Sequence, residues 1–237
     1  MRKTPTISHL KLPFQFEEKK LVHDLNLIFN MQWTPIHYVQ NYKGGWKSIA
    51  LYAPDGNASN TFTDNFDIPL KPTHILKSCH YLKEVILQFK SKLLSVRLLR
   101  LMPNSQIKPH TDHMLGYENN NFRIHIPITT NDQITFTLNN QELNMQPGEC
   151  WYTNVNFIHS VFNKGKTDRV HLVIDLERNE WSDELFFSLA PKESFAISDE
   201  VYSKEVLTQM IFALEKNDTP AAKKLVITYK EKLIKMS

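Results

Sequence analysis

The stretch PHTDH at residues 109–113 is the part of the sequence around which the rest of the chain is organised. Pro109 fixes its own φ angle and disfavours helical geometry in the residue before it, so this stretch is a poor place for a helix interior. Side chains alternate between the two faces of an extended segment, so we expect His110 and Asp112 to point one way and His113 the other. The stretch therefore predicts a strand that presents an imidazole and a carboxylate together.

A second stretch, NFIH at residues 156–159, adds a histidine far enough along the chain for several strands to intervene. His110, Asp112 and His159 together match the two-histidine, one-carboxylate facial triad that suits non-haem Fe(II) and leaves coordination positions open. The tripeptide His-x-Asp is common, so the triad alone does not establish a metal site. It defines the candidate metal ligands.

Two later segments alternate apolar residues with arginine and histidine: FRIHIPI at 122–128 and RVHLVID at 169–175. Such alternation predicts half-buried strands. Arg123 and His125 share the polar face of the first segment, and Arg169 and His171 share that of the second. Arginine keeps its charge and offers a rigid fork for carboxylates, so this lining favours a pocket for an anionic ligand. The alternative, that each arginine only pairs with a structural acid, stays open at this point.

Length and composition describe an ordinary globular protein. The chain has 237 residues, 41% hydrophobic and 22% charged, which suits one domain of jelly-roll or barrel size. The net charge of +3 is too small to indicate nucleic-acid binding, and no basic run is interleaved with aromatic residues.

The sequence also bears on the cellular compartment. No apolar run is long enough to span a membrane, and the basic N-terminus lacks the apolar core of a secretory signal. Cys79 and Cys150 form neither a close metal-ligand pair nor a disulfide framework. We therefore expect a cytoplasmic protein with no membrane partner, in a reducing compartment that keeps iron ferrous.

Short strands dominate the centre of the chain. Apolar spacing predicts helices over 16–29 and 77–90, and a strand over 46–53 precedes a loop over 55–73. From residue 93 the pattern changes to strands over 93–102, 105–110, 121–128, 133–138, 141–145, 149–154, 157–163 and 169–176. The pairs Asn139-Asn140 and Pro147-Gly148 predict tight turns between them. Many short strands at such spacing are typical of a sandwich or barrel.

The pattern becomes helical again after Trp181. A helix is expected to start at residues 198–200, and Thr219-Pro220 is a good start for a last one. The sequence thus predicts a β-rich domain with N-terminal helices over 1–180 and a helical extension over 181–237. We expect the extension to pack on the barrel or on a second subunit, which would give a homodimer.

Four stretches between residues 93 and 176 occur in a specific order: RLLRLMPNSQIKPHTDH, NFRIHIPI, PGECWYTNVNFIHS and DRVHLVIDLE. In that order they resemble the aspartyl/asparaginyl β-hydroxylase family of Fe(II)- and 2-oxoglutarate-dependent oxygenases. Within the family they look most like the bacterial cis-proline hydroxylases. The resemblance implies a mainly β, double-stranded β-helix (jelly-roll, cupin-like) core.

The resemblance also implies roles for individual residues. It implies that His110, Asp112 and His159 bind iron and form the catalytic centre, that Arg169 binds the distal carboxylate of 2-oxoglutarate, and that His125 helps to hold this co-substrate. The family's animal, protein-hydroxylating members have Gly in place of Asp112, so this triad is more like that of the enzymes acting on free amino acids.

Arg123, His171, Arg97 and Trp151 are expected around the substrate. Arg123 falls where the family handles substrate or co-substrate carboxylates, and His171 matches the proline-hydroxylase type. Arg97 and Arg100 lie on opposite faces of one predicted strand, so at most one points inward. Trp151 is expected either to wall the pocket or, more often for such a residue, to be a buried core aromatic.

The expected function is hydroxylation of an unactivated C–H bond in a small amino acid, proline-like or another, with Fe(II), 2-oxoglutarate and O2. One alternative is hydroxylation of Asp, Asn or other side chains in a peptide, protein or natural-product intermediate. Two others are a metal hydrolase or isomerase on a cupin-like barrel and a non-catalytic small-molecule binding barrel. Arg169 discriminates against the hydrolase or isomerase, because only a carboxylate-bearing co-substrate needs it.

Overall fold

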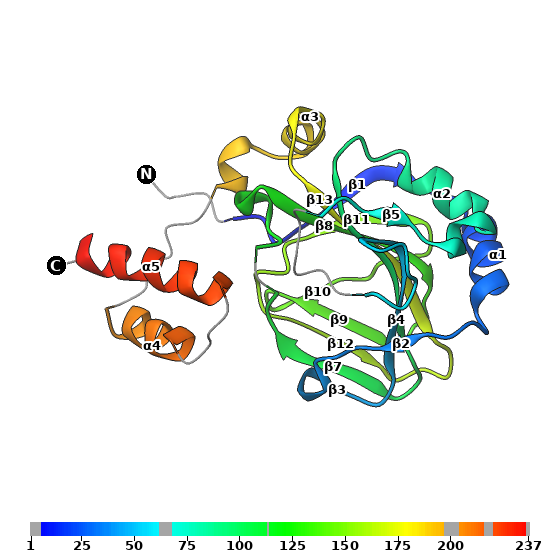
Figure 1. Cartoon of the computed structure of the whole chain (residues 1–237), viewed down its shortest axis with the longest axis horizontal. Coiled ribbons are helices and arrows are strands. Elements are labelled where there is room, and N and C mark those ends of the chain that lie inside the picture. The colour runs from blue at the N-terminus through cyan, green and yellow to red at the C-terminus, as the bar shows by residue number, and fades with distance from the viewer. Residues whose placement is uncertain (1–5, 62–67, 113, 197–203, 216–219, 236–237) are drawn as a thin grey trace. The chain divides into compact units, whose positions relative to one another are not determined.

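The computed structural model describes residues 6–61, 68–112, 114–196, 204–215 and 220–235 (Figure 1). The chain forms two compact units, residues 1–196 and 197–237. The first unit contains all the strands described below, and the second contains helices α4 (Lys204–Glu215) and α5 (Pro220–Lys235). The division follows Ala196, so residues 181–196, which the sequence-based division assigned to the C-terminal extension, belong to the first unit.

Two antiparallel sheets make up the first unit. The larger sheet has the order β1-β11-β8-β13-β6-β4-β2, with β5 beside β4, and the smaller has the order β10-β9-β12-β7-β3. The strands of the larger sheet are β1 His9–Gln15, β2 Thr34–Pro35, β4 Trp46–Ala53, β5 Lys71–Pro72, β6 Leu93–Leu101, β8 Asn121–Thr129, β11 Glu149–Thr153 and β13 Arg169–Glu177. Those of the smaller sheet are β3 Tyr42–Lys43, β7 Ser105–His110, β9 Ile134–Leu138, β10 Gln141–Glu142 and β12 His159–Asn163. This is the predicted jelly-roll core.

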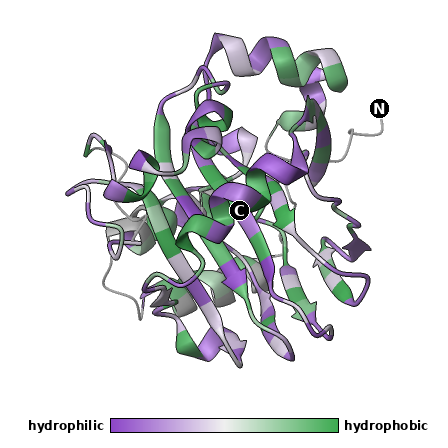
Figure 2. Ribbon diagram, turned by 90° about the vertical axis from the view of Figure 1, so that its right-hand side faces the viewer, coloured by the Kyte–Doolittle hydropathy of each residue, from purple (hydrophilic) through white to green (hydrophobic). Residues whose placement is uncertain are grey.

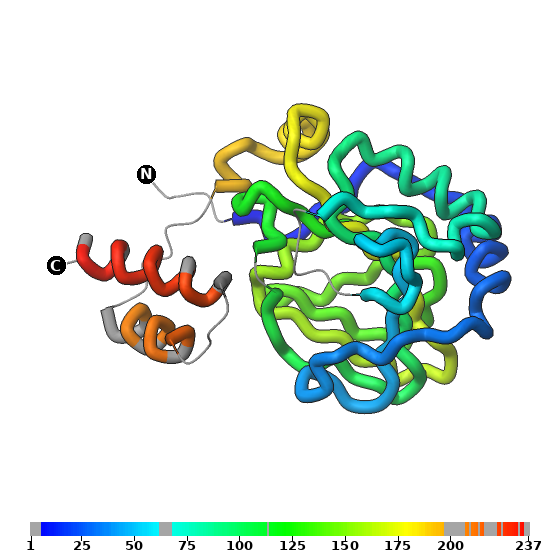
Figure 3. Tube along the Cα trace, viewed as in Figure 1, coloured from blue at the N-terminus to red at the C-terminus, as the bar shows by residue number. Residues whose placement is uncertain are grey.

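Helices cover one face of the larger sheet. Helices α1 (Glu18–Ile28) and α2 (His80–Ile86) are far apart in sequence but lie side by side, joined by a hydrogen bond from Leu82 N to Asp24 Oδ2 of 2.9 Å (Figure 3). Their apolar faces pack with α3 (Glu180–Leu189) against the isoleucines of β8 and the even-numbered apolar residues of β13. A smaller apolar cluster comes mainly from β7, β9 and β12 and includes Phe136 and Val161.

Alternation along the strands decides which side chains face which layer, and it is visible as bands of opposite hydropathy (Figure 2). Ile124, Ile126 and Ile128 join the cluster beneath the helices. The alternate residues, including Arg123 and His125, point away from that cluster and are nevertheless buried. The expectation of half-buried strands was therefore wrong for β8 and β13, because a second layer covers their polar face as well.

Most predicted strands are confirmed, with bounds that differ by a few residues. The tight turn at Asn139-Asn140 is confirmed by positive φ angles of 50° and 60°, which asparagine tolerates. The strand predicted over 141–145 ends at Glu142, and the helix predicted over 77–90 begins at His80 after the short 3-10 helix η2 (His74–Lys77). The other 3-10 helices are η1 Val39–Asn41, η3 Tyr117–Asn119 and η4 Lys192–Phe195.

Some predictions lie outside the described residues, including His113, the helix starts at 198–200 and at Thr219, and the middle of the 55–73 loop. Strand β1 was not predicted, and helix α3 falls in the part after Trp181 that was predicted to be helical, although its start was not singled out. Among the described helices none is long and apolar enough to cross a membrane. The expected homodimer stays a prediction.

Candidate metal centre

The two candidate histidines meet across neighbouring strands. Strand β7 ends at His110, β12 begins at His159, and the two residues are direct register partners in the antiparallel pair. Their ring centroids are 4.2 Å apart. Pairing of β7 with β12 thus brings together two residues that are distant in sequence.

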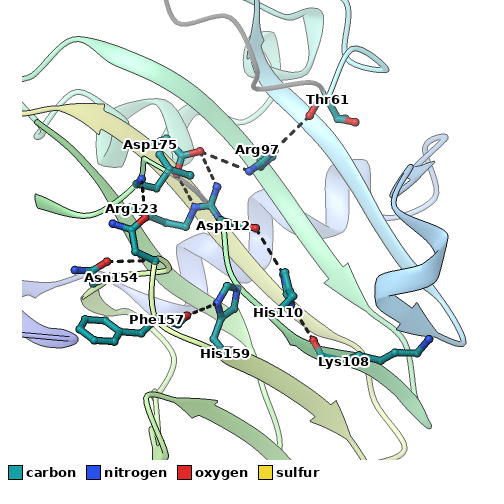
Figure 4. Close-up of polar contacts among 12 residues, drawn as sticks. Thr61, Arg97, Lys108, His110, Asp112, Arg123, Asn154, Phe157, His159 and Asp175 are labelled. Carbon is teal, nitrogen blue, oxygen red and sulfur yellow. Dashed lines mark hydrogen bonds and ion pairs between the residues drawn. The ribbon is translucent and has the colours of Figure 1, made fainter. Parts of the chain in front are cut away.

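Backbone contacts orient both imidazoles. His110 Nδ1 lies 2.8 Å from the carbonyl oxygen of Lys108, and His159 Nδ1 lies 3.1 Å from that of Phe157 (Figure 4). A carbonyl oxygen only accepts, so each Nδ1 carries the hydrogen and each Nε2 keeps a free lone pair, the form that binds a metal. Burial lowers the pKa of His159 to about 4, although Asp112 opposes the shift, so this imidazole is neutral at neutral pH.

Asp112 completes the group from just beyond the end of β7. Its backbone N–H donates to the carbonyl of Val155 at 2.8 Å, which ties its segment to the loop before His159. Its Oδ1 lies 3.6 Å from Nε2 of His110, and one ligand atom from each of the three residues lies within 4.8 Å of the others. Burial alone would raise the pKa of Asp112, but Arg123 and the two histidines hold it at about 2. The predicted triad is therefore close together, with His159 neutral and Asp112 ionised as metal binding requires.

Arg123 is held by two carboxylates. Its Nε and one terminal nitrogen donate to Asp175 at 2.6 and 3.0 Å, and its other terminal nitrogen donates to Asp112 Oδ2 at 2.5 Å (Figure 4). Arg97 approaches Asp175 Oδ2 at 3.5 Å and donates to the carbonyl of Thr61 at 3.2 Å. The sequence did not single out Asp175, although it lies on the same face of β13 as Arg169 and His171.

Arg169 differs from Arg123 in having no acidic partner among the residues that the structure describes. It is 2% exposed, its Nε has no hydrogen-bond partner there, and its guanidinium lies 5.5 Å from the centre of the Phe136 ring. Burial lowers the pKa of Arg169 to about 9, which still leaves it cationic at neutral pH. Burying a cation without a charged partner costs free energy.

A short chain of ring nitrogens extends from Arg169. The arginine donates to His171 Nδ1 at 3.0 Å, so that nitrogen carries no hydrogen. His125 Nδ1 lies 3.4 Å from the same atom, and if it shares that acceptor as a second, weaker donor, a lone pair is left on His125 Nε2. Burial, and next the charge of Arg169, lower the pKa values of both histidines well below the usual range, so both are neutral.

Two small pockets adjoin these residues. Arg169 and His171 line the first, together with apolar residues that include Phe136, Leu143 and Met145. Arg97 lines the second, with Thr61, Tyr52 and Ser95 among its neighbours. Of the cationic lining predicted from β8 and β13, Arg169 and His171 of β13 line the first of these pockets, whereas Arg97 in the second comes from β6.

The remaining predicted residues lie on the same sheet. Trp151 pairs in register with His125, is partly buried against the smaller apolar cluster, and donates from Nε1 to Glu149 Oε2 at 2.9 Å. Arg97 and Arg100 differ as expected: Arg97 joins the Asp175 group, whereas Arg100 pairs with Asp168 at 2.6 Å and stacks over Phe29.

Comparison with known proteins gives a consistent result. Residues 17–179 match the family model described as aspartyl/asparaginyl beta-hydroxylase. L-proline cis-3-hydroxylase 1 of Streptomyces sp is 26% identical over 193 residues, covering 80% of this chain and 64% of that protein. L-proline cis-4-hydroxylase of Rhizobium meliloti (strain 1021) is 27% identical over 172 residues, covering 72% and 61%. The chain thus spans about three fifths of the length of these relatives.

A solved structure supports the fold. An oxidoreductase of the 2OG-Fe(II) oxygenase family from Burkholderia pseudomallei superposes with a TM-score of 0.52 at 14% identity, covering 73% of this chain and 86% of that one. At this identity the similarity shows a shared fold and no more.

Proposed function

The chain belongs to the aspartyl/asparaginyl β-hydroxylase family, and we propose that it is an Fe(II)- and 2-oxoglutarate-dependent dioxygenase that hydroxylates a C–H bond of a small amino acid, proline-like or another. The observation that carries the proposal is the convergence of His110, Asp112 and His159 in a chain whose strand β13 also carries a buried arginine, Arg169, without an acidic partner among the described residues. Neither feature is explained by the stability of the fold.

The donor set fits a ferrous ion. Two imidazoles offer Nε2 and one ionised carboxylate offers oxygen, the ligand types of the non-haem iron triad. When bound, iron with 2-oxoglutarate and O2 supplies the oxidising power needed to attack an unactivated C–H bond. The protein's part is to hold the ligands, orient both substrates and exclude water.

Arg169 fits the distal carboxylate of 2-oxoglutarate. A guanidinium binds a carboxylate through two parallel hydrogen bonds, and the unpartnered Nε of Arg169 can provide one of them. His171 accepts a hydrogen bond from Arg169 and so fixes the orientation of its fork. His125, held by the same ring, keeps an acceptor nitrogen and is proposed to line the co-substrate site.

The substrate is proposed to bind on the Arg97 side. The pocket there carries a guanidinium and small polar groups, which suits the carboxylate of an amino acid. Arg123 has three of its five N–H groups occupied by carboxylates, so its predicted role as the main substrate anchor depends on the remaining two. Trp151 is proposed as an apolar wall. These roles stay proposals.

The test is 2-oxoglutarate consumption by the purified chain with Fe(II), ascorbate and the free amino acids. His110→Ala, Asp112→Ala and His159→Ala should each remove turnover, because each deletes one metal ligand. His74→Ala, at an exposed histidine in η2, is the matched control and should keep it. A triad variant with wild-type iron affinity and turnover would show that the residue is not a ligand.

A further inference from the structure

Asp175 is a completely buried acid that is not a metal ligand in the proposed site. Its side chain has 0% exposure, and it faces Arg123 directly in the register of β13 and β8. The two side chains form a bidentate pair with distances of 2.6 and 3.0 Å. A bidentate pair fixes the plane of a guanidinium as well as its position.

The same guanidinium binds only one of the two carboxylate oxygens of Asp112. Arg123 binds Oδ2 at 2.5 Å, whereas Oδ1 is the oxygen near Nε2 of His110, at 3.6 Å. Figure 4 shows the continuous path from Asp175 through Arg123 to Asp112. One oxygen is therefore held away from the histidines, and the other is left for the metal.

We infer that Asp175 is a positioning residue, which holds Arg123 so that Asp112 offers a single oxygen to the metal. A carboxylate with both oxygens free can bind a metal through both of them and take an additional coordination position. Two positions are needed by 2-oxoglutarate and one by O2, so a bidentate Asp112 would compete with them. The inference depends on the proposed function only in requiring that the triad binds a divalent metal.

The second arginine makes the role of Asp175 specific. Arg97 approaches the same carboxylate at 3.5 Å, so Asp175 is the acid that separates the buried cation of Arg123 from the half-buried one of Arg97. If Asp175 is replaced by a neutral residue, no acid separates the two guanidinium groups, and they repel each other. Arg123 then keeps Asp112 as its one charged partner among the described residues. We expect Arg123 to move and the geometry of Asp112 to change with it.

Cobalt binding tests this without reference to turnover. Co(II) in place of iron has a visible absorption whose intensity depends on coordination number, so a titration reports both affinity and geometry. For Asp175→Asn in the full chain we expect Co(II) affinity to fall roughly tenfold to hundredfold, the usual effect of losing a partner of a metal ligand, with an altered spectrum. The matched control is Asp168→Asn, which removes the acid of another Arg–Asp pair, formed by the residue just before β13 and Arg100 of β6 at 2.6 Å, and should leave both unchanged.

A second variant tests the inference independently, in case Asp175→Asn does not fold. Arg123→Lys keeps the buried charge but cannot bind Asp175 and Asp112 together as a planar fork, so it should change the cobalt spectrum in the same direction. If Asp175→Asn and Arg123→Lys both match Asp168→Asn in affinity and spectrum, Asp175 has only a structural role and the inference is wrong. A wild-type chain that binds no cobalt would instead overturn the metal site itself, and this inference with it.

Discussion

At the scale of single residues, Arg169 is the side chain whose environment most strongly favours the binding of an anionic ligand. It is buried, cationic at neutral pH and held by a neutral histidine rather than by an acid. Truncating one member of a buried charge pair typically costs about 3–5 kcal/mol. Arg169→Ala should therefore raise the KM for 2-oxoglutarate by roughly two to three orders of magnitude, at about 1.4 kcal/mol per factor of ten.

Two further variants sharpen that prediction. Arg169→Lys should recover only part of the loss, because a point charge replaces a fork. Arg100→Ala, on the neighbouring strand and paired with Asp168, should leave this KM unchanged. A KM for 2-oxoglutarate in Arg169→Ala within threefold of the wild-type value would rule out Arg169 as the anchor.

Residue patterns predicted the triad but not its partners. His-x-Asp and a later histidine were readable because the metal needs these residue types. Asp175 could have been noticed, since it lies six residues after Arg169 on the same face of a strand. The hydrogen bond from Arg123 to Asp112 could not have been predicted from the sequence, because it depends on how the segment beyond the end of β7 lies against the other sheet.

At the scale of elements, Tyr117 joins the segment that follows Asp112 to helix α3. Its hydroxyl lies 2.6 Å from Asp183 Oδ1 and 3.0 Å from Ser182 Oγ, and the ring stacks on Phe186 with 4.2 Å between centroids. Burial first, then the hydrogen bond to Asp183, raise the pKa of Tyr117 well above its usual range, so the hydroxyl stays a donor.

Removing that hydroxyl should loosen the connection. We expect Tyr117→Phe to lower the free energy of unfolding by about 1–3 kcal/mol, because the buried Ser182 and the half-buried Asp183 lose a hydrogen-bond partner while the ring packing is kept. The control is Tyr81→Phe, whose hydroxyl accepts one exposed hydrogen bond from Glu17 N at 2.8 Å and should cost less than about 1 kcal/mol. Equal effects in urea denaturation would contradict this account of the α3 connection.

Strong periodicity explains which elements the sequence predicted. The strands β6, β8 and β13 carry clear alternation or continuous apolar runs, and their predicted bounds agree closely with the structure. Strand β1 carries Pro13 and a mixed pattern, and it exists because it pairs with β11, a long-range contact. Helix α3 starts with a capping box between Asn179 and Ser182, a local signal that its short apolar face did not reinforce.

At the scale of the whole molecule, metal binding should be visible as stability. A ligand that binds only the folded state, at a hundred times its Kd, adds about 2.7 kcal/mol. For a chain of this size that corresponds to a rise in Tm of roughly 5–10 °C. Adding Co(II) should therefore raise the Tm of the wild-type chain, and His159→Ala should lose most of the shift. An equal rise in Tm in both proteins would show that the metal binds at a site that does not include His159.

The central claim is tested most directly by the product. The purified chain, incubated with Fe(II), ascorbate, 2-oxoglutarate and each free amino acid, with proline first, should yield one amino acid heavier by a single oxygen atom. The same product should be absent without 2-oxoglutarate or in His159→Ala. A chain that adds no oxygen to any free amino acid, yet hydroxylates a residue inside a peptide with both termini blocked, would contradict the proposed substrate class. A chain that binds iron and 2-oxoglutarate but oxidises neither kind of substrate would contradict the proposed activity.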